Sequence, residues 1–135
     1  MTAQHIKLVK KSWFMFRNIK PEIIADAFYS RLFLEHPELR PLFPQSMEAQ
    51  YEKLIGMLNI VVGRLDRLEE LTQDIADLAV RHKNYGTKPA HYDAVGKALL
   101  WTLEMGLGSD WTEETAEAWG VCYTLLSKTM IEAAA

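Results

Sequence analysis

The sequence lacks the features of several large functional classes. One cysteine, Cys122, stands among 135 residues, which excludes an internal disulfide and any metal or iron–sulfur site built from several cysteines. Lysine and arginine number 15 against 18 acidic residues, a net charge of −3, and the signs are mixed, so no basic face for nucleic acid is indicated. There is neither a secretory core nor an apolar run near the roughly 20 residues that cross a bilayer. We expect a soluble, cytoplasmic protein without nucleic-acid or membrane partners.

Signals for β-strands are also missing. No segment alternates apolar and polar residues convincingly, and no Asn-Gly or Asp-Gly dipeptide marks a hairpin. Apolar residues recur instead at spacings of three and four, as in Ile6, Val9, Trp13 and Phe16. The length is that of one domain. We predict a single all-α domain over residues 1–135, with about seven helices joined by short connections.

Helix boundaries can be placed from prolines, glycines and capping residues. Pro21 and Pro89 suit the first turns of two helices. Gly86 is expected to end the helix that precedes Pro89. Ser46 is expected to cap a helix that runs to about residue 65. Thr112, followed by two glutamates, is expected to begin the last helix.

Two of the predicted helices carry a single polar residue at the end of an apolar stripe. The positions are Gln50, Leu54, Met57 and Val61 in the first, and Leu71, Ile75, Leu78 and His82 in the second. An amide or imidazole buried without a partner costs about 1–3 kcal/mol, so a plain core would not favour them. A cofactor would satisfy both groups, although a helix histidine is commonly solvated or bonded to the backbone.

A lone histidine restricts the choice of cofactor. Without cysteine or carboxylate companions it cannot make a four-ligand zinc site, whereas a haem needs only one protein ligand. His82 is therefore a candidate iron ligand, with the carbonyl of Leu78, one turn earlier, in reach of its other ring nitrogen. A plain helical core remains the alternative at this point.

The sequence resembles the single-domain bacterial globins, the lineage of the flavohaemoglobin haem domains and of the neuroglobin-like, Hell's Gate-type globins. The resemblance covers nearly the whole chain and is carried by FYSRLF at 28–33, HPELRPLF at 36–43, QYEKL at 50–54, RHKNYG at 81–86 and HYDAVGKALL at 91–100. It implies a globin fold, with about seven helices in a three-over-three arrangement around a haem pocket.

The resemblance assigns site residues one by one. His82 matches the proximal histidine that binds the iron of haem b, and Phe43 matches the corner phenylalanine that packs on the porphyrin. Tyr29 and Gln50 fall on the distal positions that face a bound ligand. Leu54 matches the apolar residue that limits the space above the iron.

The resemblance also implies that Leu78 and Tyr92 contribute to the cofactor site on the side of His82. In flavohaemoglobin-like globins a tyrosine and a glutamate hold the proximal histidine and ease peroxidase-like chemistry. Tyr92 matches the tyrosine, but Ala134 stands at the glutamate position, two residues after Glu132. This departure puts a peroxidase-like activity in doubt, and a shifted helix end that brings Glu132 into the role is left open.

The implied function is reversible binding of O2, and of other diatomic gases such as NO and CO, at ferrous iron. Bound O2 carries partial negative charge and CO little, so donors from Tyr29 and Gln50 predict high O2 affinity and slow release. With no distal histidine, a vacant or water-bound sixth site is expected, and Lys53 is expected near the haem propionates or in solvent. The alternative is NO dioxygenation with a separate reductase. A gas sensor, which needs an output domain or a signalling partner, is less favoured.

Overall fold

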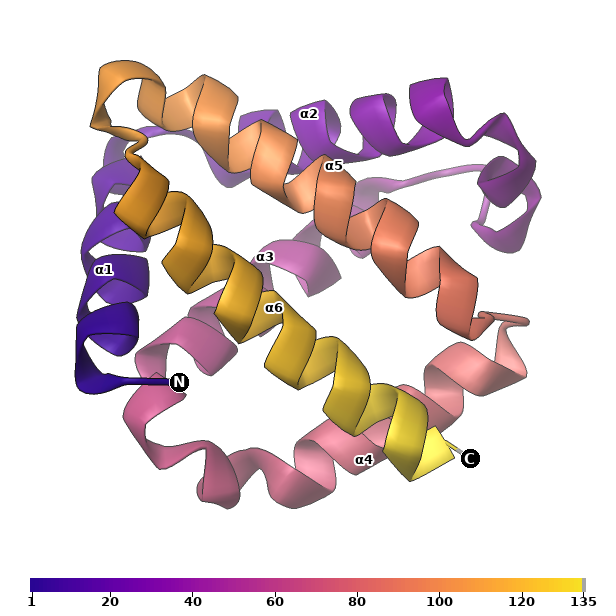
Figure 1. The fold of residues 1–135 in the computed structure, drawn as a ribbon. Coiled ribbons are helices and arrows are strands. Elements are labelled where there is room, and N and C mark those ends of the chain that lie inside the picture. The colour runs from indigo at the N-terminus through magenta and orange to yellow at the C-terminus, as the bar shows by residue number, and fades with distance from the viewer. Residues whose placement is uncertain (135) are drawn as a thin grey trace.

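The computed structural model describes residues 1–134, which fold into six α-helices with no strand among them (Figure 1). The predicted all-α architecture is therefore confirmed. The helices are α1 (Ala3–Phe14), α2 (Pro21–Glu35), α3 (Glu48–Gly63), α4 (Thr72–Asn84), α5 (Pro89–Leu107) and α6 (Glu113–Ala134).

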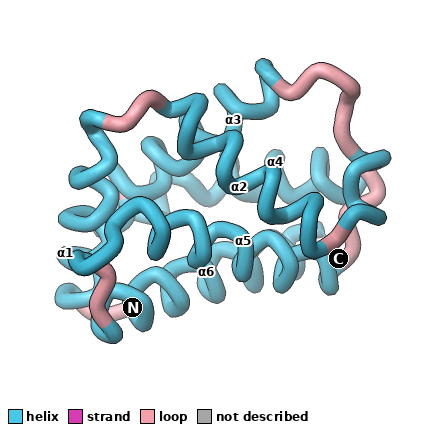
Figure 2. The backbone as a smooth tube through the Cα atoms, turned by 90° about the horizontal axis from the view of Figure 1, so that it is seen from above, coloured by secondary structure: helices cyan, strands magenta, loops and turns pink. Residues whose placement is uncertain are grey.

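The connections between these helices are themselves mostly helical. Four 3-10 helices lie in them, at Met15–Asn18, Pro37–Leu42, Leu65–Leu71 and Gly108–Asp110. The second contains Pro41, which has no amide hydrogen to donate and so favours a short, irregular turn over a continuous α-helix. Because the linking segments are short, little of the backbone lies in loops (Figure 2).

The structure confirms three predicted helix starts. Pro21 and Pro89 occupy the first positions of α2 and α5, where a missing amide hydrogen costs nothing. At the start of α6 the Thr112 hydroxyl accepts a hydrogen bond from the Thr115 amide at 3.1 Å. The hydroxyl thereby satisfies one of the amides that have no partner at a helix N-terminus.

The predicted capping role of Ser46 is wrong. Helix α3 begins at Glu48, and its capping position is Met47, which makes no side-chain hydrogen bond there. The preceding loop is held from another direction, because the Arg40 guanidinium donates to the carbonyl oxygens of residues 43, 44 and 45 at 3.3, 2.9 and 2.9 Å. The loop is thus anchored to the corner before it, and the helix starts one residue later than a Ser46 cap implies.

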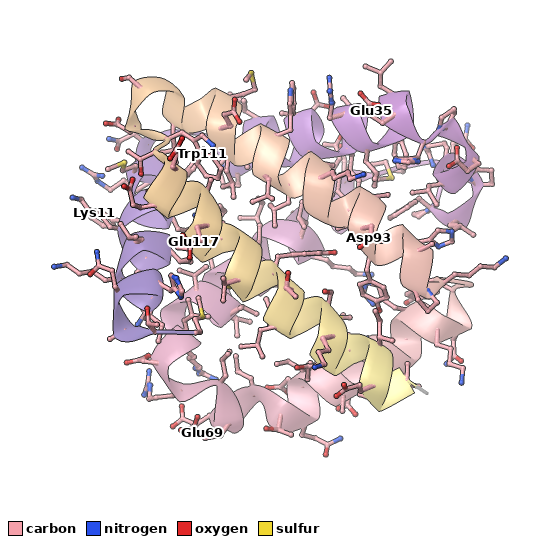
Figure 3. The ribbon with its side chains drawn as sticks, in the orientation of Figure 1. Lys11, Glu35, Glu69, Asp93, Trp111 and Glu117 are labelled. Atoms are coloured by element: carbon pink, nitrogen blue, oxygen red, sulfur yellow. The ribbon has the colours of Figure 1, made fainter. Side chains whose placement is uncertain are left out.

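The longest helix, α6, lies diagonally across the molecule and packs against α1 at one end and α4 at the other (Figure 1). Helix α2 packs against α5 and α3. A buried polar contact joins α6 to α1, because the Trp119 indole donates to the Ser12 hydroxyl at 2.8 Å. Charged side chains such as Lys11, Glu35 and Glu69 lie at the periphery (Figure 3). Among residues 1–134, no helix is long and apolar enough to cross a membrane.

Candidate functional site

His82 lies in the last turn of α4, and the end of that helix is sharply defined. Gly86 has a φ of 90°, a backbone conformation that favours glycine. The Gly86 amide donates to the carbonyl of Lys83 and the Thr87 amide to the carbonyl of His82, both at 3.0 Å. This pair of bonds is the Schellman motif that ends many helices. The predicted helix end at Gly86 is confirmed, and it fixes the backbone that carries His82.

The imidazole of His82 is oriented by its own helix. Its Nδ1 lies 2.8 Å from the carbonyl oxygen of Leu78, and a carbonyl can only accept, so Nδ1 carries the hydrogen. The other nitrogen, Nε2, has no hydrogen-bond partner within residues 1–134, and the side chain is half-buried. The rings of Tyr92 and Tyr85 flank it, with centroids at 6.4 and 6.5 Å. The arrangement leaves one imidazole lone pair available to a ligand.

The region of α6 that meets α4 supplies no carboxylate to this imidazole. Glu132 is exposed and makes no hydrogen bond or ion pair within the described part of the chain. Instead the Lys83 ammonium donates to the carbonyl oxygen of Ala134 at 2.8 Å. The Tyr92 ring stacks beside His82, but its hydroxyl is not bonded to the imidazole. Leu78, and not Tyr92 or Glu132, is the observed hydrogen-bond partner of His82.

Gln50 and Tyr29 meet across helices α3 and α2. The Gln50 amide nitrogen donates to the Tyr29 hydroxyl oxygen at 3.0 Å. Tyr29 is only 4% exposed, and burial raises the pKa of its phenol to about 12. The phenol therefore stays protonated at neutral pH. Because its oxygen accepts from Gln50 and its hydrogen has no acceptor among residues 1–134, it can still donate.

The Tyr29 ring lies in an aromatic cluster with Phe33 of its own helix, Tyr51 of α3 and Phe43, which directly follows the proline-rich corner. Phe43 and Phe33 lie at centroid distances of 5.6 and 5.9 Å from it, and Tyr51 at 5.6 Å with nearly parallel planes. Phe43 and Leu54 are both half-buried and pack against the core. The cluster restricts the motion of the phenol, and Phe43 joins it from the end of the corner at Pro37–Leu42.

An open cleft of about 260 Å³ lies between α3 and α4, and three of its eight lining residues are charged. Its lining does not include Gln50, His82 or Lys53, which is exposed on α3. The lining residues are Met57, Ile60, Val61, Leu71, Asp74, Ile75, Asp77 and Arg81.

The donor set, and not this cleft, limits which cofactor fits. No cluster of three metal-ligating side chains occurs within residues 1–134, which leaves His82 as a lone imidazole donor whose Nε2 has no protein partner there. A group that brings its own four nitrogens and needs one protein ligand suits that arrangement. The residues present fit a haem.

Sequence reasoning missed several residues around this site. Tyr51 and Asp26 form a hydrogen bond at 2.8 Å beside Tyr29, and Arg40 holds the loop that follows Phe43. Neither α3 nor the corner shows a periodicity that singles them out. Asp26 and Tyr51 lie on different helices, so their bond forms only once α2 and α3 have packed, whereas the acceptors of Arg40 are three to five residues further along the chain.

The family model for globins matches residues 26–130. A protein of Aquifex aeolicus, described as an uncharacterized globin-like protein, is 32% identical over 131 residues, which cover 97% of this chain and 92% of that protein. A flavohemoprotein of Bacillus subtilis is 30% identical over 113 residues, covering 82% of this chain but 28% of its own length. The chain thus spans less than a third of that longer relative.

The fold agrees with these relatives. An engineered carbene transferase, made from a Rhodothermus marinus protein provisionally named a nitric oxide dioxygenase, has a TM-score of 0.88 and 25% identity. That alignment covers 99% of this chain and 93% of the other. Since the family match spans most of the sequence and the expected three-over-three helical fold is present, the chain belongs to the globin family.

Proposed function

We propose that this chain binds haem b with His82 as the protein ligand of the iron, and that its role is the reversible binding of O2. The observation that carries the proposal is the bond from His82 Nδ1 to the Leu78 carbonyl, which leaves the Nε2 lone pair available. Globins bind haem, and a bound haem supplies an iron centre that takes small diatomic gases. The proposal rests on the family membership and on this donor geometry together.

Each residue on the side of His82 has a definite task in this proposal. The Leu78 carbonyl fixes the tautomer and ring orientation of His82 and raises the basicity of Nε2. Leu78 and Phe43 would provide apolar contacts to the macrocycle and keep water away, while Leu54 would limit the space above the iron on the opposite side. Tyr92 would hold the plane of the imidazole by stacking, since its hydroxyl makes no bond to it.

The residues on the opposite side would set the preference among gases. With a pKa of about 12, the Tyr29 phenol remains a donor over the whole physiological pH range. Its hydrogen would favour a ligand with partial negative charge, such as O2, over nearly neutral CO, and a buried hydrogen bond to a charged atom is stronger than one between neutral groups. Gln50 would hold the Tyr29 oxygen from the other side and act as a second donor.

A second candidate function is NO dioxygenation, in which NO is oxidised to nitrate. It is favoured by the flavohemoprotein relatives and by the Rhodothermus marinus neighbour that is provisionally named for this reaction. Repeated turnover would need electrons from a reductase outside these 135 residues. The residues described above would serve either use, because both need a donor that favours O2.

The test is to load the purified chain with haem, reduce it, and record absorption spectra before and after adding O2 and CO. We expect a ferrous spectrum that changes with each gas and returns when the gas is removed. His82→Ala should lose the haem or the proximal bond. His5→Ala is the control, because His5 is bonded only to Thr2 and Glu117 in the part of the chain described. A wild-type chain that binds no haem would overturn the proposal.

The two candidate functions can then be separated with NO. Adding NO to the oxygenated protein in the presence of a reductant system should produce nitrate continuously if the chain is a dioxygenase. A single conversion followed by stalling would support O2 binding as the main role.

A further inference from the structure

Two hydrogen bonds, close together, link helices α2 and α3 beside the candidate gas site. One runs from the Gln50 amide to the Tyr29 hydroxyl at 3.0 Å. The other runs from the Tyr51 hydroxyl to the Asp26 carboxylate at 2.8 Å. Asp26 and Tyr29 are three residues apart on α2 and so share a face of that helix, and their partners are consecutive on α3. The two bonds therefore act on the same stretch of both helices.

The Tyr51 ring itself is also placed against Tyr29. The two phenol planes differ by only 9°, with centroids 5.6 Å apart. The Gln50–Tyr29 bond by itself leaves these two side chains free to turn about it. The Tyr51–Asp26 bond lies about one turn away on α2, and the Tyr51 ring stacks on Tyr29. Together they limit the movement of Tyr29 and Gln50. The geometry thus ties the position of Tyr29 to the Tyr51–Asp26 bond.

We propose that Tyr51 and Asp26 are positioning residues that hold Gln50 on the Tyr29 oxygen, so that the Tyr29 hydrogen is directed to a bound gas. This inference rests on the proposed function of the site. Neither residue needs to touch the cofactor or the gas. Tyr51 acts through its stacked ring and through its place next to Gln50, and Asp26 acts by fixing the Tyr51 hydroxyl.

The exposure of the pair separates this role from a role in stability. Asp26 is exposed and Tyr51 is half-buried. Interactions between exposed polar groups contribute little to folding, so loss of the bond should leave the fold intact. At 2.8 Å the bond has the usual length of a hydroxyl hydrogen bond, and a carboxylate acceptor makes it stronger than one between neutral groups, which suits a positioning role.

The test uses variants that break the bond from either side. Tyr51→Phe keeps the stacked ring and removes the hydroxyl, and Asp26→Ala removes the acceptor. Asp26→Asn retains an oxygen acceptor and should restore most of the wild-type behaviour. Asn59→Ala is the matched control, because the exposed Asn59 accepts from the Trp13 indole at the same 2.8 Å and joins α3 to α1 instead of α2.

The first readout is taken on the haem-loaded protein. The infrared stretch of bound CO senses donors near the gas, and we expect Tyr51→Phe and Asp26→Ala to shift or split the wild-type band. Their O2 dissociation rates should rise by about 3- to 10-fold, the factor that corresponds to losing one ordinary hydrogen bond. Asp26→Asn and Asn59→Ala should stay close to wild type. An unchanged band and rate in both Tyr51→Phe and Asp26→Ala would overturn the inference.

The second readout needs no haem and therefore distinguishes failure of this inference from failure of the proposed function. In the 15N-labelled full chain, the side-chain amide of Gln50 is identified by its absence in Gln50→Glu. Its exchange with water should accelerate in Tyr51→Phe and not in Asn59→Ala. If this exchange is unchanged in Tyr51→Phe, the positioning role is wrong even where haem binding succeeds. If it accelerates in a chain that binds no haem, the coupling stands and the gas-binding role falls.

Discussion

At the scale of single residues, the chemistry depends on which hydrogen each polar group keeps free. His82 gives its Nδ1 hydrogen to the Leu78 carbonyl and keeps a lone pair on Nε2. Tyr29 receives a hydrogen from Gln50 and keeps its own. The first relation follows from helix geometry alone, since residues four apart are one turn apart, and it was predictable from the sequence. The second joins two helices: the resemblance assigned both residues to the distal side, but the hydrogen bond between them was not predicted.

Tyr29→Phe is expected to raise the O2 dissociation rate by about 10- to 100-fold, because a hydrogen bond to a partly charged atom contributes roughly 1.5–3 kcal/mol. CO dissociation should change much less. Both rates can be measured by ligand replacement in stopped flow. Tyr92→Phe is the control, because it removes a hydroxyl that is not bonded to His82 and keeps the stacked ring. An equal effect of the two substitutions would contradict the assignment of Tyr29.

At the scale of elements, the end of α4 and the start of α5 were easier to predict than the start of α3. Gly86 and Pro89 have backbone properties that no neighbouring contact needs to supply, so their roles could be predicted locally. The prediction for Ser46 was wrong because α3 begins only at Glu48, after a loop that the Arg40 side chain holds through the carbonyls of residues 43, 44 and 45. The Tyr51–Asp26 bond was missed for a different reason, because it depends on how two helices cross.

Gly86→Ala should destabilise the end of α4 by about 1–2 kcal/mol, because a φ of 90° forces a side chain into a strained backbone conformation. The fraying should reach His82, whose carbonyl accepts the capping bond from Thr87, so haem should dissociate faster. Haem transfer to an acceptor apoprotein measures this rate. Gly120→Ala is the control, because a methyl group there meets nothing within 4 Å, and it should leave haem retention unchanged. Equal haem loss in both variants would argue against the motif.

At the scale of the whole molecule, several weak acids are buried in the core in their neutral forms. Burial raises the pKa of Tyr29 from its ordinary 10.0, and that of Cys122 from its ordinary 9.0, to about 12 in each case. The pKa of Tyr123 is raised as well, chiefly by burial, and its hydroxyl donates to the Tyr92 carbonyl at 2.6 Å. The Cys122 side chain is only 2% exposed. These groups make the folded state depend on remaining protonated.

Stability should therefore fall at alkaline pH. Below about pH 8 the folded and unfolded chains both hold these protons, so their contribution to the free energy of unfolding is constant. Between the ordinary pKa values and about 12, the unfolded chain releases protons that the folded chain keeps, and stability decreases as pH rises. Each group contributes up to about 1.4 kcal/mol per pH unit. Urea unfolding from pH 8 to 11 should show this decline, and the double variant Tyr29→Phe, Cys122→Ala should show a shallower one. A parallel decline in the double variant would mean that other groups, Tyr123 first among them, control the alkaline limit.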